Sequence, residues 1–417
     1  MTRPAPAPRA RPPASSRALL WMLVALTSGF TLSTAFRTVA AMLAAPLQQD
    51  FALSPQALGI FAGTFHFAFG AMQMFMGISI DLYGVRRTIL AVFPLAIGGA
   101  LLSALAPGFG WLVLAQALIG VGCAPAFLVC TVFIARHFAP ARFAALSGAA
   151  MALGTVGMLL TGTPLAWVVQ AWSWRAGFGV LAALALLAWM WMWRGVHEPA
   201  VAATADAPPR ESLAEAARRF AALLALPHTW GIVALGAVTY AALIALRGLW
   251  LGPMLIARHS WSLVDSGNVA LALSLVALAG PLLFGRIDPG PAQRRRWLLA
   301  CTLAMAALFA ALALRLPPAL EVALMLAIGL LSGFIVLQYA DVRAAYPAQL
   351  TGRAMAVFTM AMFLGVAALQ WFTGVVASLA QGRVDDPFGP VMAAIAALLV
   401  LAGLAFARLP QPPAAGG

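Results

Sequence analysis

The chain is a succession of long apolar stretches separated by short polar ones. Each apolar stretch is 18 to 29 residues long, and a helix needs about 20 mostly apolar residues to cross a bilayer. The pattern predicts transmembrane helices and no other kind of element. Twelve helices are expected, over residues 18–45, 57–80, 88–106, 111–134, 144–169, 176–193, 228–256, 267–285, 297–314, 320–340, 354–379 and 390–407.

The composition agrees with a protein that is surrounded by lipid. Hydrophobic residues make up 63% of the 417 positions and charged residues only 9%, whereas soluble domains are about half apolar and about a quarter charged. Such a chain has too little polar surface to cover itself in water. We therefore predict an all-α membrane protein whose main partner is the lipid bilayer.

The basic residues orient the predicted helices. All 25 are arginines, and if the N-terminus is cytoplasmic, 19 lie on the cytoplasmic side, four lie outside and two lie within helices. This asymmetry is the positive-inside pattern, so both termini are predicted to be cytoplasmic, in the inner membrane of a bacterial cell. The same pattern accounts for the net charge of +13, and no nucleic-acid partner is expected.

Polar segments divide the chain into five parts. No cleavable signal peptide is evident in the Pro-, Ala- and Arg-rich start, and residues 210–226 alternate charged and apolar residues at helical spacing, which predicts an amphipathic helix on the inner leaflet. The predicted parts are a disordered basic cytoplasmic arm (1–17), an N-terminal six-helix bundle (18–193), a cytoplasmic linker with the amphipathic helix (194–227), a C-terminal six-helix bundle (228–407) and a cytoplasmic tail (408–417).

The two predicted bundles share features about 210 residues apart. Arg37 is the twentieth residue of the first helix, and Arg247 is the twentieth residue of the seventh. The loops after the second and eighth helices each carry an aspartate followed by arginines. Paired repeats of this kind place a substrate site at the interface of the two halves, near the middle of the membrane. We expect the chain to act as a monomer.

The loop after the second helix reads Gly77-Ile-Ser-Ile-Asp81-Leu-Tyr-Gly84-Val-Arg86-Arg87. It resembles the G-x-x-x-D-x-x-G-x-R-R/K signature of the major facilitator superfamily in the same loop. Gly77 is expected to allow close helix packing, and Gly84 to take the positive φ of a tight turn. The resemblance implies that Asp81 accepts hydrogen bonds that break when a transporter changes state. The alternative is a loop that only sets topology.

The resemblance extends from residue 19 to residue 407. Trp174-Arg175 between the fifth and sixth helices, Gly352-Arg353 before the eleventh, and the glycine-rich fifth helix all agree with it. It implies two pseudo-symmetric six-helix bundles, alternating access, and a cavity lined by helices one, four, seven and ten. One position departs from the family pattern: Gln116 stands four residues before a glycine, where many members carry an arginine associated with proton coupling.

The two arginines within helices carry the functional hypothesis. An arginine near mid-membrane costs about 2.5–3.5 kcal/mol on insertion scales, and no aspartate or glutamate lies well inside a predicted helix. The carboxylate or phosphate of a substrate could supply the missing charge through bidentate bonds. We predict that Arg37 and Arg247 face each other and clamp one anion. The alternative is that they bind backbone carbonyls and are purely structural.

The sequence around these arginines is similar to one branch of the superfamily. Ala35-Phe-Arg37-Thr and Ala245-Leu-Arg247-Gly-Leu-Trp resemble the paired arginines of glycerol-phosphate and sugar-phosphate antiporters, in the organic-anion branch. The resemblance implies that both arginines are anion ligands. The other binding residues of those antiporters have no clear counterpart here, so the resemblance implies no particular substrate.

Three further side chains are candidate substrate-binding residues. His66 lies near the middle of the second helix, and an imidazole titrates near neutrality, so it is the best candidate for proton coupling; the alternative is a packing residue. Tyr240 precedes Arg247 by seven residues, on the same helix face. Gln116 is a polar candidate in the fourth helix, as are Gln73, Gln338 and Gln370 elsewhere.

These features predict a secondary active transporter for a small organic anion, either a carboxylate or a phosphate ester. It could exchange its substrate for a counter-anion or carry a proton through His66. The alternatives are an efflux pump for hydrophobic or cationic compounds, a class that tends to carry a membrane-embedded carboxylate, and a sensor that resembles a transporter. No nucleophile, metal-ligand cluster or phosphate-binding loop stands out, so no enzyme activity, catalytic residue, metal or cofactor is predicted.

Overall fold

A computed structural model describes residues 16–139, 142–197, 218 and 222–410. The predicted basic arm, most of the linker with its amphipathic helix, and most of the tail lie outside these residues. The regular elements in the described part are all helical. In chain order they are α1 (Ser16–Thr38), α2 (Ala40–Phe51), α3 (Pro55–Val92), α4 (Pro94–Ala104), α5 (Phe109–Cys123), α6 (Ala126–His137), α7 (Phe143–Leu160), α8 (Thr163–Ala171), α9 (Trp174–Gly195), α11 (Pro227–Ala245), the π-helix η2 (Leu246–Trp250), α12 (Leu251–His259), α13 (Leu263–Arg286), α14 (Pro291–Leu312), α15 (Pro318–Leu331), the 3₁₀-helix η3 (Ser332–Phe334), α16 (Ile335–Ala345), α17 (Ala348–Ala380) and α18 (Phe388–Arg408).

Within the described residues, eleven helical segments are long and apolar enough to cross a membrane. The longest, Pro55–Ala104, has 50 residues, more than twice the length that one crossing needs. Its chain reverses at Gly84, whose φ of 83° and ψ of 168° are not helical. This segment therefore makes two crossings, which agrees with the twelve predicted.

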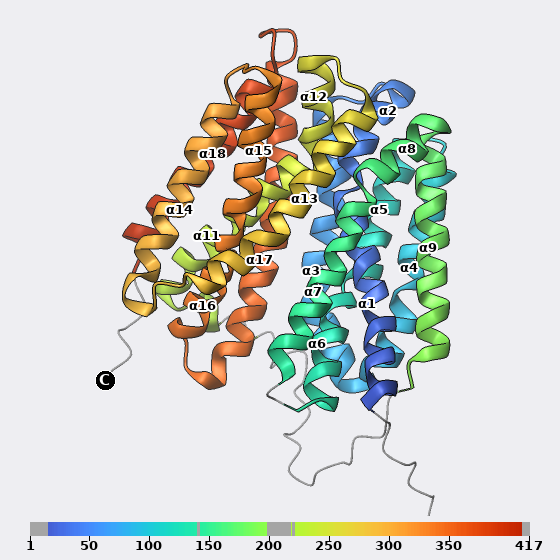
Figure 1. Ribbon diagram of the computed structural model, residues 1–417, viewed down its shortest axis with the longest axis vertical. Helices are drawn as coiled ribbons and strands as arrows, with labels where there is room; N and C mark the ends of the chain where they lie inside the picture. Colours follow the sequence, from blue (N-terminus) through green and yellow to red (C-terminus); the bar gives the residue numbers. More distant parts are fainter. Residues whose placement is uncertain (1–15, 140–141, 198–217, 219–221, 411–417) are drawn as a thin grey trace, which may run out of the picture.

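The helices form two bundles, α1–α9 and α11–α18, which converge at one end and separate at the other (Figure 1). Helix α1 begins at the end where the bundles separate, and α18 ends there. We call this end the terminal end, and we call the opposite end, where the bundles converge, the distal end. The helix pairs that join the bundles include α3 with α17, α7 and α8 with α13, and α2 with α12 and η2. The bundles are in contact at the distal end and apart at the terminal end.

Glycines allow the bundles to meet backbone to backbone. A Cβ added to Gly59 of α3 would lie 2.4 Å from the carbonyl oxygen of Gln370 in α17. A Cβ on Gly252 of α12 would lie 2.2 Å from the carbonyl oxygen of Ala41 in α2. In lipid there is no hydrophobic driving force between helices, and small residues at helix interfaces allow the close van der Waals packing that holds helices together instead. These glycines therefore hold the distal end closed.

Several membrane-crossing segments change geometry along their length. The chain breaks between α1 and α2, between α3 and α4, between α5 and α6, and between α7 and α8; it widens into η2 between α11 and α12, and tightens into η3 between α15 and α16. Such breaks release backbone carbonyls, which lipid cannot satisfy. A side chain satisfies one of these carbonyls: between α5 and α6, Gln73 Nε2 donates a hydrogen bond to the Ala124 carbonyl at 3.3 Å.

The signature loop adopts the turn that its sequence predicts. Gly84 has a positive φ, as expected. Asp81 pairs with Arg136 of α6 at 3.2 Å, while Arg86 donates to the carbonyl oxygens of Trp193 and Val196 at the end of α9. Arg87 is exposed.

The expected close packing at Gly77 is wrong for this conformation. A Cβ there would meet only a methyl carbon of Leu128, at 3.9 Å. The reason is that Gly77 lies near Leu128 of α6 in its own bundle at ordinary van der Waals distance, so α3 makes no backbone-to-backbone contact at this residue.

The loop between α13 and α14 repeats this turn in the second bundle. Gly290 has φ 79° and ψ 171°, almost the values of Gly84. Asp288 pairs with Arg294 at 2.7 Å, and the hydrogen bond from that guanidinium holds the pKa of the Asp288 carboxyl below its usual value. The repeat inferred from the charges therefore extends to the backbone.

Replacing Gly84 with alanine is expected to strain the turn. A side chain in this region of φ and ψ costs about 1–3 kcal/mol, so the thermal midpoint of the purified Gly84→Ala protein should fall by a few degrees. Gly98→Ala is the control, because Gly98 is helical and a Cβ there has nothing within 4 Å. Equal midpoints for the two variants would show that the turn is not strained.

Candidate functional site

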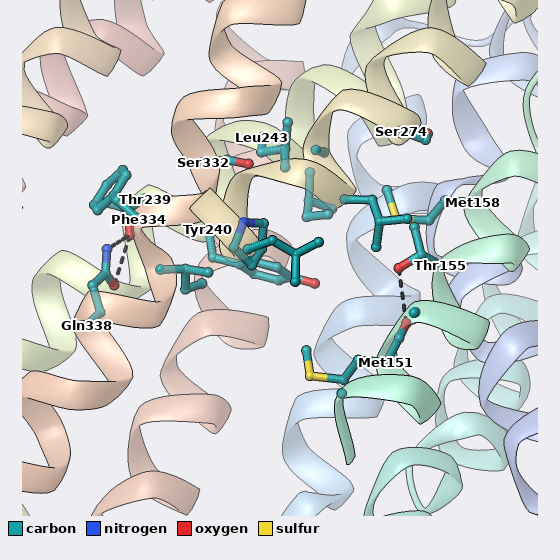
Figure 2. Close-up of a pocket in the computed structure, with 18 residues that line it drawn as sticks. Met151, Thr155, Met158, Thr239, Tyr240, Leu243, Ser274, Ser332, Phe334 and Gln338 are labelled. Atoms are coloured by element: carbon teal, nitrogen blue, oxygen red, sulfur yellow. Dashed lines mark hydrogen bonds between the residues drawn. The ribbon is translucent and has the colours of Figure 1, made fainter. Parts of the chain in front are cut away.

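A cavity of about 350 Å³ lies between the two bundles (Figure 2). Met151 and Met158 of α7 line one side, and Tyr240, Ser274 and Gln338 from α11, α13 and α16 lie among the residues on the other. The lining therefore comes from the fifth, seventh, eighth and tenth membrane-crossing segments. The expectation of helices seven and ten is confirmed for this cavity.

Helices one and four do not line this cavity, contrary to expectation. Two glycines of α7 explain the absence of helix one. A Cβ on Gly154 would lie 2.1 Å from the ring of Phe30, and one on Gly157 would lie 1.8 Å from the Thr31 carbonyl. Because α7 packs so closely onto α1, it stands between α1 and the cavity.

Arg37, at the end of α1, is half-buried. Its Nη1 donates to the Tyr240 hydroxyl across the interface, at 3.3 Å. The rings of Phe69 and Phe363 lie 4.9 and 4.7 Å from the guanidinium carbon, so cation–π attraction contributes. The Nε atom is buried without a hydrogen-bond partner. Arg37 therefore retains bonding capacity next to a residue that lines the cavity.

Arg247 lies in the π-helix η2 and is completely buried. Its Nε donates to the Ser274 hydroxyl and the Ala270 carbonyl, both at 2.9 Å. Its Nη2 donates at 2.8 Å to the Met158 carbonyl, which belongs to the other bundle, while Nη1 has no partner. Arg247 thus bonds one half of the molecule to the other.

The two guanidinium groups do not share a partner. Arg37 extends toward α3 and α17, whereas Arg247 extends toward α7 and α13. Their backbones are nevertheless adjacent, because a Cβ on Gly248 would lie 3.4 Å from the Arg37 carbonyl. Each arginine bonds to residues that line the cavity, but the expected face-to-face clamp is not assembled in this conformation.

Neither arginine forms an ion pair with a carboxylate of the described residues. Two buried acids of the second bundle already have cations as partners: Asp341 pairs with Arg295 at 3.3 Å, and Glu321 pairs with Arg258 at 2.7 Å and with His259 at 2.9 Å. Asp386 also pairs with Arg258, at 2.5 Å. The network of Arg258 lies at the distal end, where α12 ends and α15 begins, and no aspartate or glutamate is among the described residues that line the cavity.

His66 forms a polar cluster with Arg37 and Gln370. The imidazole is buried, its Nδ1 lies 3.1 Å from the Ala62 carbonyl, and Arg37 and Gln370 lie close enough to interact with it. His66 Nε2 and both polar atoms of the Gln370 amide are buried without a hydrogen-bond partner of good geometry. The structure thus brings three of the polar candidates together.

Gln116 does not join this cluster or line the cavity. It is buried in α5, and its amide nitrogen has no hydrogen-bond partner. Sequence reasoning missed Ser274 and Met158, which hold Arg247. No spacing in the sequence could have revealed them, because both bonds join different helices.

Comparisons with known proteins agree on one family. The model of the family described as "Major Facilitator Superfamily" matches residues 25–370. Among curated proteins, the mouse "Solute carrier family 2, facilitated glucose transporter member 10" is 29% identical over 170 residues, and the "Hexuronate transporter" of Bacillus subtilis (strain 168) is 26% identical over 155. The alignment with the mouse protein spans 40% of this chain and 32% of that protein, and the alignment with the Bacillus protein spans 36% of each. The chain therefore matches about a third of each relative's length.

Two solved structures share the fold over nearly the whole chain. A bacterial homolog of the human lysosomal transporter Spinster, inward-facing and occupied, has a TM-score of 0.73 at 18% identity, covering 94% of this chain and 97% of that one. The D-xylose-proton symporter has a TM-score of 0.74 at 16% identity, covering 94% and 98%.

Removing the Arg247 guanidinium is expected to loosen the distal closure. Spin labels at Gln170→Cys and Arg383→Cys, in a Cys301→Ala background, report the distance between the exposed distal ends of the two bundles. The Arg247→Leu variant should add a population with a longer distance, because the bond to Met158 is lost. Arg315→Leu is the control, since Arg315 bonds only within its own bundle, to the Arg258 carbonyl. Identical distance distributions for both variants would contradict a role for Arg247 in closure.

Proposed function

This chain belongs to the Major Facilitator Superfamily, and we propose that it is a secondary transporter for a small organic anion, a carboxylate or a phosphate ester. As a multi-pass membrane transporter it is not an enzyme. The proposal places it in the inner membrane of a bacterial cell, with both termini in the cytoplasm. One relative is named a hexuronate transporter, and a hexuronate is a carboxylate, which supports the substrate class.

The observation that carries the proposal is the unpaired charge of Arg37. A cation within the membrane is costly without a compensating anion, and no carboxylate of the described residues supplies one. The guanidinium of Arg37 contacts the Tyr240 hydroxyl and the rings of Phe69 and Phe363. An anionic substrate would add charge-assisted hydrogen bonds, which contribute about 1.5–3 kcal/mol each. Arg37 and Tyr240 are therefore the proposed first contacts of the anion.

The shape of the molecule supports alternating access. The bundles converge at the distal end and separate at the terminal end (Figure 1), so with cytoplasmic termini the proposal treats this conformation as inward-facing. In the proposed cycle, the bond from Arg247 to the Met158 carbonyl breaks when the distal end opens. The freed guanidinium then becomes the second anion ligand, as the paired arginines of the sequence suggest.

Two coupling schemes fit this site. In the first, a counter-anion occupies the same cation on the return step, and the transporter exchanges anions. In the second, His66 carries a proton. Protonation would put a second positive charge beside Arg37, and an anion bound between them would offset the repulsion. Anion binding and protonation of His66 would then favour each other.

Two other functions remain as rivals. Efflux of hydrophobic compounds is favoured by the apolar residues of the cavity wall, such as Leu243 and Leu278, although the nearby cation disfavours cationic compounds. A sensor that binds the ligand without moving it would share the same site. Counterflow in proteoliposomes separates them: labelled organic anions should exchange, labelled cations should not, and a sensor would move neither.

Arg37→Ala is expected to abolish anion counterflow while the protein still inserts. Loss of one or more charge-assisted bonds should weaken anion binding by about 10- to 150-fold. Arg247→Ala should do the same, as the second ligand. Arg17→Ala is the control, because this exposed arginine lies at the start of the same helix. Normal transport by Arg37→Ala or by Arg247→Ala would show that the anion is not held by two arginines.

His66→Ala is expected to remove the pH dependence of uptake and leave exchange intact. The physical reason is that the imidazole is the titratable side chain beside Arg37 in this cluster. The measurement is the initial rate of anion uptake and of anion exchange across a series of pH values. A variant with the pH profile of the wild type would rule out proton coupling through His66.

A further inference from the structure

We infer that the substrate is an amphipathic monocarboxylate, with its carboxylate at Arg37 and Tyr240 and an apolar body in the cavity between the bundles. The inference rests on the proposed function and narrows it. It disfavours sugar acids, whose bodies carry many hydroxyls, and phosphate esters, which carry a second charge; from the hexuronate transporter it takes only the carboxylate. Three features of the site lead to it: the wall, the state of the polar groups in the wall, and the position of the charge.

The wall of the cavity is mostly hydrocarbon and thioether. Met151 and Met158 face Leu243, Ile244 and Leu278 across it, and Figure 2 shows the two methionines opposite the Tyr240 ring. Contact with such a wall is favourable for an apolar group in proportion to the surface removed from water. Methionine also adapts its shape to irregular ligands. The wall therefore suits an aliphatic or aromatic body.

The polar side chains in the wall already have partners. The hydroxyls of Thr155, Ser274 and Ser332 each donate to a carbonyl of the preceding turn, between 2.6 and 3.1 Å away. Thr239 and the Gln338 amide bond to each other at 2.8 and 3.2 Å. A polyhydroxylated ligand would lose hydrogen bonds to water and find few free donors here. The wall therefore disfavours sugar acids.

The charge lies at one edge of the cavity. No charged side chain is among the lining residues, and Arg37 reaches the wall only through the Tyr240 hydroxyl. Phe69 and Phe363 lie against the guanidinium, so its edge, where the N–H donors lie, is left for polar contact. A planar carboxylate matches that edge in a bidentate bond. In this conformation Arg247 is held by Ala270, Ser274 and Met158, so Arg37 is the cation that is available to the substrate, which suits a monoanion.

The test is a series of straight-chain carboxylates as competitors of labelled hexanoate counterflow in proteoliposomes. Acetate, butanoate and hexanoate should bind with about fourfold higher affinity for each added methylene, the value expected for apolar burial. Benzoate should compete as well as hexanoate. Glucuronate and hexanamide should compete at least about tenfold more weakly, because the first has a polar body and the second has no charge.

A variant that narrows the cavity tests where the body lies. Ala152 lines the cavity, so Ala152→Leu should reduce the preference for hexanoate over acetate by about tenfold, the effect of excluding one or two methylenes. Ala149→Leu is the matched control, since Ala149 is exposed one turn earlier in α7 and is not a lining residue. An unchanged preference in Ala152→Leu would place the body elsewhere and overturn the inference.

The outcomes separate this inference from the proposed function. If glucuronate or a phosphate ester exchanges in an Arg37-dependent way and chain length has no effect, the inference is overturned and anion transport stands. If hexanamide competes as well as hexanoate and Arg37→Ala changes nothing, both are wrong. A chain-length series that is lost in Ala152→Leu and retained in Ala149→Leu supports both.

Discussion

A buried cation must find a partner when its surroundings are lipid and protein, and three arginines of this molecule do so in different ways. Arg258 pairs with Glu321 and Asp386. Arg247 has no acid and instead uses two carbonyls and a hydroxyl, one of them from the other bundle. Arg37 has one phenol and two aromatic rings. The degree to which each charge is compensated corresponds to a role: a structural anchor, a bond between halves, and the proposed anion contact.

The second constraint is that the halves must come together and separate again. Glycines such as Gly59 and Gly252 let helix backbones of the two bundles contact each other at the distal end. At these glycines the contact is made by backbone atoms, because there is no side chain between the helices. The directional bonds across the interface include those from Arg247 to Met158, from Arg37 to Tyr240, from Thr163 to Asn268 at 2.6 Å, and from the Gln56 backbone N–H to the Ser378 hydroxyl at 2.9 Å. Two of them involve the candidate site, so in the proposed cycle occupation of the site and closure of the distal end would be connected.

Much of the fold could be predicted because its signals are local. Helix length and apolarity follow from the thickness of the bilayer, and the positive φ of Gly84 follows from the absence of a Cβ. The interior of the site could not be predicted. The packing of α7 onto α1 through Gly154 and Gly157 excludes helix one from the cavity wall, and the direction of each guanidinium depends on helices that are distant in sequence.

The sequence by itself determined the class of protein, the number of crossings, the repeat, and the presence of two arginines at matching positions within helices. These follow from composition and spacing along one chain, which lipid constrains strongly. Only the tertiary structure decided that Arg247 bonds across the bundles, that Arg37 lies beside Tyr240 and His66, and that the cavity wall is largely apolar. Those features depend on which helices face each other, and in lipid that choice depends on the shapes of small residues at helix interfaces more than on any hydrophobic pattern.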